Sequence, residues 1–173
     1  MKNINSCMTI AASILAASVA QADLIEYDIL WEVVSGSGTA TGSVTIDSSL
    51  APNNGDGVFA DPFGGAFTNF SVTISGATGG NGTFTSIAGD IDFMLFDTSG
   101  FVDFSSELMS QGTVADFNFL SFNPSSPSGN STNLFYTAGN TDSFSVVSVT
   151  PVPAPGAFAL LGLTTLAATR RRR

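Results

Sequence analysis

The sequence predicts an all-β fold, an antiparallel β-sandwich or jelly roll of about nine short strands. Three observations support this prediction. Apolar and polar residues alternate with a period of two over repeated short stretches, which is typical of half-buried strands. Clusters of Gly, Asn, Ser and Pro separate these stretches and provide the turns. Residues 23–150 contain no capped helical pattern.

The first predicted strand covers residues 24–34, where Tyr27, Ile29 and Trp31 alternate with acidic residues. A Ser-Gly-Ser-Gly turn at 35–38 joins it to a second strand at 39–47, so the two form a hairpin. Long loops are expected at 48–65 and 123–130, both rich in Pro, Asn, Gly and Ser. The remaining strands are expected at residues 67–75, 83–87, 91–97, 101–108, 114–122, 134–137 and 142–150.

Aromatic residues are the main candidates for the core. The chain has 15 phenylalanines and one tryptophan, and each fully buried side chain of this size stabilises the fold by about 1.5–3 kcal/mol. Tyr27 and Trp31 share a strand face and have two interpretations. They either stack on sugar rings, as aromatic residues do in lectins, or belong to the core, which is commoner for a single Trp on an apolar strand face.

The N-terminal segment, residues 1–22, is typical of a secretory signal peptide. Lys2 provides a positive start, residues 8–19 are apolar, and Ala20-Gln21-Ala22 offers small residues for signal peptidase. We expect cleavage after Ala22, with Ala20 as the alternative. Cys7 precedes the apolar run and leaves with the signal, so the exported chain has no cysteine for disulfides or thiolate metal sites.

The expected passenger domain, residues 23–150, is acidic throughout. All 14 carboxylates lie between residues 23 and 142, and this part contains no Lys, Arg or His. Its formal charge is therefore −14, whereas the whole chain has −9 because its five basic residues lie in the end segments. Binding to nucleic acid is excluded because it requires cationic groups to neutralise phosphate. Stability must come from apolar burial and hydrogen bonds, and salt should ease the repulsion.

The C-terminal segment, residues 151–173, has three parts. A proline-rich start precedes an apolar stretch, and the chain ends in a cationic cluster of Arg170, Arg171, Arg172 and Arg173. From Gly156 to Thr169 there are 14 residues, which make a helix of about 21 Å. A bilayer core is about 30 Å thick. So short a span favours a temporary stop before cleavage, and an unprocessed membrane anchor is the alternative.

The tail, the signal peptide and the Gly/Ser/Thr/Phe-rich passenger together resemble a PEP-CTERM protein. Pro153-Ala154-Pro155 stands where that family has Pro-Glu-Pro, followed by the helix from Gly156 and the arginine cluster. The resemblance implies cleavage near this motif by an exosortase, after transient insertion in the inner membrane. It also implies delivery to the cell surface or to an exopolysaccharide matrix. Ala154 departs from the family pattern, so a variant sorting enzyme is one reading.

Few residues of the passenger suggest catalysis or metal binding. Asp90 and Asp92 lie about 7 Å apart along one predicted strand, which is the separation of a glycosidase pair, but solvent-facing acids are common in so acidic a domain. The domain has no residue for a serine triad or a Schiff base. Calcium takes only oxygen ligands, and its weak candidates in the long loop are Asn53, Asn54, Asp56 and Asp61.

The sequence therefore predicts a non-enzymatic exported protein of the cell surface or extracellular matrix. Its expected role is structural or adhesive within exopolysaccharide, and its expected processing partners are signal peptidase and an exosortase-type protease. The first alternative is a carbohydrate-binding module, with or without calcium, which requires exposed aromatic residues in a concave site. The second is a hydrolase on a jelly roll, which requires carboxylates that converge in a cleft.

Overall fold

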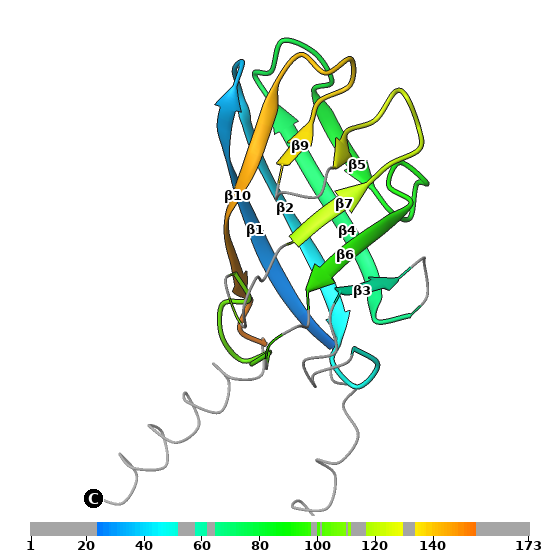
Figure 1. Ribbon diagram of the computed structural model, residues 1–173, viewed down its shortest axis with the longest axis vertical. Coiled ribbons are helices and arrows are strands. Elements are labelled where there is room, and N and C mark those ends of the chain that lie inside the picture. Colours follow the sequence, from blue (N-terminus) through cyan, green and yellow to red (C-terminus); the bar gives the residue numbers. More distant parts are fainter. Residues whose placement is uncertain are drawn as a thin grey trace, which may run out of the picture.

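The computed structural model describes residues 24–51, 58–61, 65–97, 100, 102–109, 111, 117–129 and 134–154. These residues form an all-β, antiparallel fold without a helix, as the alternating pattern predicts (Figure 1). The strands are β1 (Leu24–Ser35), β2 (Thr39–Asp47), β3 (Val58–Asp61), β4 (Phe67–Ser75), β5 (Gly82–Thr85), β6 (Phe93–Asp97), β7 (Phe117–Leu120), β8 (Ser128–Gly129), β9 (Leu134–Tyr136) and β10 (Ser143–Pro151). The expected signal peptide and C-terminal helix lie outside the described residues.

The strands form one large curled sheet and one small sheet. The large sheet has seven strands in the order β5-β4-β2-β1-β10-β9-β8, and the small sheet has the order β3-β6-β7. The predicted hairpin of β1 and β2 is confirmed, because residues 24–31 pair in continuous register with 40–47. β1 also pairs with β10, and this ladder has irregularities at Leu30/Trp31 and Val33/Ser35. Such bulges increase the local twist of a strand, which is consistent with the curl.

Two features of the strand prediction are wrong. Residues 101–108 form no strand where the structure describes them, and their turns follow from side-chain hydrogen bonds. The Asp103 carboxylate accepts hydrogen bonds from the backbone N–H of Ser105 at 2.9 Å and from its hydroxyl at 2.6 Å. Such local bonds compete with a ladder for the backbone. The two predicted loops also contain short strands, β3 within 48–65 and β8 within 123–130.

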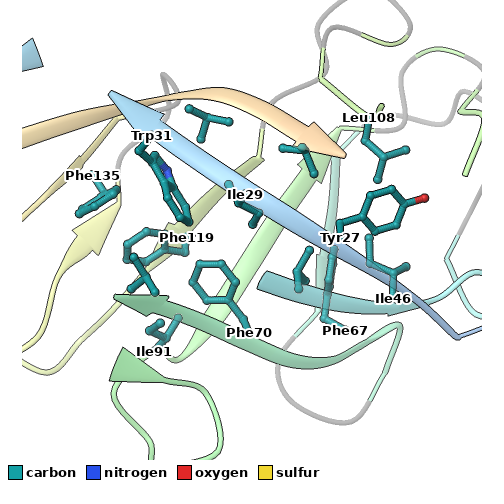
Figure 2. Packing of buried hydrophobic residues seen from close by; sticks show 14 of the residues in the cluster. Tyr27, Ile29, Trp31, Ile46, Phe67, Phe70, Ile91, Leu108, Phe119 and Phe135 are labelled. Atoms are coloured by element: carbon teal, nitrogen blue, oxygen red, sulfur yellow. The ribbon is translucent and has the colours of Figure 1, made fainter. Parts of the chain in front are cut away.

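The core is aromatic and lies on the inner face of the large sheet. The Trp31 ring meets Phe70 and Phe135 edge to face, with ring centroids 6.4 and 5.4 Å apart (Figure 2). Phe119 of β7 packs between the same two phenylalanines, at 5.1 Å from each. The Phe119 ring of the small sheet thus contacts side chains from two strands of the large sheet, β4 and β9. This contact joins the sheets through side chains.

Trp31 also depends on a glycine in the neighbouring strand. A Cβ at Gly42 would collide with the Ser71 carbonyl and lie 3.0 Å from the Trp31 ring. The absent side chain lets the strands and the indole approach each other closely. Gly42 therefore has a packing role in a strand whose other inward residues, Ala40, Val44 and Ile46, are fully buried as predicted.

Candidate functional site

Both ends of the described domain lie at the same end of the large sheet. β1 begins at Leu24 beside Asp47, and β10 ends at Pro151, which pairs with Tyr27 (Figure 1). One further hydrogen bond extends this pairing, from the Val152 N–H to the Glu26 carbonyl at 2.8 Å. The start of β1 and the end of β10 therefore lie side by side, at what we call the proximal end.

The first residues of the predicted sorting motif are exposed where the chain leaves the sheet. Pro153 and Ala154 are exposed to solvent directly after the last hydrogen bond of the ladder. Together with the start of β1 and residues 104–105, they line a depression of about 520 Å³. An exposed, extended segment is accessible to a protease.

Several predicted processing residues lie outside the described part of the chain. They are Ala20, Ala22, Pro155, Gly156, Arg170, Arg171, Arg172 and Arg173. Within the described ranges no helix is a candidate for spanning a membrane. The calcium candidates Asn53, Asn54 and Asp56 also lie outside them, and Asp61 is described only as a backbone position in β3. The described residues contain no group of three or more His, Cys, Asp or Glu residues that could hold a metal.

The interpretation of Tyr27 and Trp31 as sugar-stacking residues is wrong, and the core alternative is confirmed. Tyr27 is fully buried and Trp31 is 5 % exposed. The Tyr27 hydroxyl donates a hydrogen bond to the Phe104 carbonyl and so anchors the irregular segment 102–109. Burial raises the pKa of this phenol well above its usual value, and the Asp103 carboxylate raises it further. The tyrosine is thus a neutral structural donor.

The side chains of Asp90 and Asp92 accept backbone hydrogen bonds in two different loops. The Asp90 carboxylate accepts a hydrogen bond from the Thr85 N–H at 3.0 Å, in the turn after β5. Asp92 accepts one from the Phe122 N–H at 2.6 Å, at the start of the β7–β8 connection. Their carboxylates therefore have structural roles at two separate turns.

Most side chains on the outward face of the large sheet carry hydroxyl groups, with Asp28 and Leu30 between them. The strand register places these side chains in rows across β10, β1, β2, β4 and β5, with neighbours about 5 Å apart. One row contains Thr150, Asp28, Ser43, Ser71 and Thr85, and the next contains Ser148, Leu30, Thr41, Thr73 and Thr83. Neighbouring hydroxyls bond to each other, with Thr73 Oγ1 and Thr83 Oγ1 2.9 Å apart.

This outer face has a shallow depression of about 500 Å³ centred on β1 and β2. Its lining combines hydroxyl groups with the carboxylates of Glu26 and Asp28. Hydroxyls both donate and accept hydrogen bonds, and carboxylates accept them. The surface can therefore exchange hydrogen bonds with a hydrated, hydroxyl-rich polymer.

The opposite, distal end is organised around Asp142, which the sequence does not single out. Its side chain is 1 % exposed, and its carboxylate accepts six hydrogen bonds of 2.8–3.4 Å. The donors are the backbone N–H groups of Ser37, Thr78 and Gly79 and the hydroxyls of Thr78, Thr137 and Thr141. One carboxylate thus ties together the β1–β2, β4–β5 and β9–β10 turns.

The electrostatics of Asp142 follow from this arrangement. Burial acts to raise the pKa of its carboxyl, but the bonds from Ser37, Thr141 and Thr78 outweigh it and lower the pKa to about 2. The only local sequence signal is an Asp that ends the Gly-Asn-Thr-Asp turn. Four of its six hydrogen bonds come from turns more than 60 residues away along the chain, so periodicity alone does not reveal it.

Comparisons with known proteins found no matching family model, no similar curated protein and no similar solved structure.

Proposed function

We propose that this chain is a non-enzymatic exported protein of the cell surface or extracellular matrix, with residues 23–150 as a β-sandwich passenger. The PEP-CTERM-like tail supports export and sorting, and the acidic, cysteine-free composition suits an extracellular location. In this proposal an exosortase-type protease acts at Pro153-Ala154-Pro155-Gly156, and the inner membrane holds the tail until then.

The observation that supports this proposal is where the described domain begins and ends. Because β1 and β10 are antiparallel neighbours, the start of the domain and the sorting motif leave it together at the proximal end. A domain held at that end presents its distal end, with the turns tied by Asp142, away from the membrane. This geometry suits a protein that is displayed on a surface and then released into a matrix.

Intact mass spectrometry of the exported protein tests the processing. We expect a species that starts at Asp23 and ends between Pro153 and Gly156. A variant with Arg170–Arg173 replaced by serine should keep the N-terminal cut and lose the C-terminal one, because the stop-transfer charge is gone. A wild-type mass that retains the four arginines would contradict the sorting proposal and favour a simple anchor.

The second candidate function is a carbohydrate-binding module, and the hydroxyl array of the outer face favours it. Sugar hydroxyls match such a surface in both donors and acceptors, and the carboxylates of Glu26 and Asp28 add strong acceptors. A glycan array with and without a calcium chelator tests this function. We expect binding to a defined class of glycan; complete absence of binding would contradict the carbohydrate role but leave the sorting proposal intact.

A further inference from the structure

A third depression lies between the β7–β8 connection and the β9–β10 turn. Its volume is about 310 Å³, near the lower limit of roughly 300–1,000 Å³ for small-molecule sites. We call it the Phe122 groove, and its lining includes Ser121, Phe122, Asn123, Ser126, Thr137 and Asn140. Phe122 is 75 % exposed, whereas the neighbouring Phe119 is buried.

Hydrogen bonds hold the wall that carries Phe122 in place. The Phe122 N–H donates to Asp92 at 2.6 Å, and the Asn123 N–H donates to the Ser121 hydroxyl at 3.2 Å. The Ser126 hydroxyl donates to the Asp90 carbonyl at 2.8 Å, which ties the loop to the segment before β6. The aromatic ring is therefore presented to solvent by a loop that is already ordered. Such preorganisation lowers the entropic cost of binding.

The opposite wall is the β9–β10 turn, and it is equally constrained. The Asn140 N–H donates to the Thr137 carbonyl at 2.9 Å, and Thr137 N–H donates to the Asp142 carbonyl at 3.0 Å. Asn140 has a φ of 55°, in the left-handed region that asparagine tolerates better than most residues. Its exposed side chain is an amide with two donors and one acceptor. Phe122 and Asn140, both exposed to solvent, therefore line the same small groove.

We infer that the Phe122 groove binds one residue of a neutral polysaccharide. A sugar ring has an apolar C–H face that packs against an aromatic ring, while its hydroxyls bond to amides and hydroxyls. The described lining residues carry no charge, and the domain around them has 14 acids and no base. An anionic polymer is repelled by this field, so the ligand is a neutral hexose polymer.

This inference rests on the proposed carbohydrate-binding function and assigns it to the groove rather than to the outer sheet face. The outer sheet face and the Phe122 groove are therefore alternative binding sites for the same class of ligand. Variants at Phe122 and at Asp28 distinguish them, because Asp28 lies in the outer-face depression and not in the groove.

Affinity electrophoresis of the full chain tests the groove. The native gels contain dextran, galactomannan or, as an anionic comparison, alginate. Because the full chain includes its apolar C-terminal segment, a detergent is added, and one without a sugar headgroup is chosen so that it does not compete for the groove. We expect retardation by a neutral polymer, and Phe122→Ala should weaken it about tenfold. Phe122→Trp should retain binding because it keeps an aromatic face. Ile87→Ala is the matched control, since Ile87 is 79 % exposed and outside the groove.

Asn140→Gly tests the opposite wall without straining it. Glycine adopts the left-handed backbone readily, so the turn should persist while the amide is lost. We expect affinity to fall about threefold to tenfold with an unchanged melting temperature.

The outcomes distinguish carbohydrate binding at the Phe122 groove from carbohydrate binding elsewhere on the domain. Weaker binding in Phe122→Ala and Asn140→Gly, with Ile87→Ala and Asp28→Asn like wild type, supports the groove. Binding that survives Phe122→Ala but is lost in Asp28→Asn overturns the groove and leaves carbohydrate binding on the outer face. A wild-type chain that binds only alginate overturns the neutral ligand. A wild-type chain that binds none of the polymers overturns the groove and counts against carbohydrate binding itself, while the mass of the exported protein still tests sorting.

Discussion

Replacing Phe135 by alanine is expected to lower the free energy of unfolding by about 3–5 kcal/mol. Phe135 is 1 % exposed, and its ring contacts those of Trp31, Phe119 and Phe144 at centroid distances of 5.4, 5.1 and 5.0 Å. The substitution would leave a cavity where β1, β7, β9 and β10 meet. Small domains are stable by only about 5–15 kcal/mol, so the variant should lose a large part of its stability.

Urea denaturation of wild type and variant measures this loss. Phe122→Ala is the matched control, because it removes the same atoms from a side chain that is 75 % exposed. We expect its free energy of unfolding to change by no more than about 0.5 kcal/mol. Equal effects of the two substitutions would show that Phe135 is not part of a packed core.

The alternating segments of the sequence predicted the fold class and several strands well. The segment 67–75 was expected as a strand and is β4 with the same bounds. Tyr27, Val44 and Val72, which alternate with polar residues in the sequence, are fully buried. These segments could be predicted because a strand with one buried face has a period of two in its own sequence. No other part of the chain is needed to read that signal.

The order of strands and the two distal features could not be predicted in this way. The pairing of β1 with β10 brings together residues more than 100 positions apart, and no local pattern encodes such a partner. Phe122 belongs to the predicted strand 114–122, but β7 ends at Leu120. Phe122 is 75 % exposed, and its N–H bonds to Asp92 instead of to a neighbouring strand. The segment 101–108 alternates as a strand does, but Asp103 and Ser105 form a turn there. In these segments, local hydrogen bonds and pairing with distant strands decided the structure, and the alternation of apolar and polar residues did not.

Replacing Asp142 by asparagine is expected to lower the melting temperature by roughly 5–10 °C, although the two side chains have nearly the same shape. The carboxylate accepts from donors on both oxygens, with Ser37 N–H at 2.8 Å on one and Thr78 N–H at 2.9 Å on the other. An asparagine NH₂ must face one of these sets of donors and cannot accept from it. The variant should therefore loosen three turns together.

The pH dependence of stability distinguishes this role from a simple packing effect. The pKa of Asp142 is about 2 in the folded chain and has an ordinary value of 3.8, so the unfolded chain binds the proton more tightly. The stabilisation is complete above the ordinary pKa and is lost as pH falls from about 4 through about 2. Repulsion among the other carboxylates changes in the opposite direction, because their protonation relieves it. Wild type should therefore be most stable at moderately acidic pH and destabilised below it.

Melting curves of wild type, Asp142→Asn and Asp28→Asn between pH 7 and pH 2 test this balance. Asp28 is exposed on the outer face, so Asp28→Asn removes the same charge without removing the buried acceptor. We expect Asp28→Asn to match or slightly exceed wild type at pH 7, since it reduces the repulsion in a domain without bases. Asp142→Asn should be less stable at pH 7 and should lose less stability on acidification. Parallel curves for Asp142→Asn and wild type below pH 4 would contradict the carboxylate as the group that joins the distal turns. Asp90, Asp92 and Asp103 also accept backbone hydrogen bonds, but Asp142 is buried. Its bonds to Thr137 and Thr141 order the β9–β10 turn, which forms one wall of the Phe122 groove.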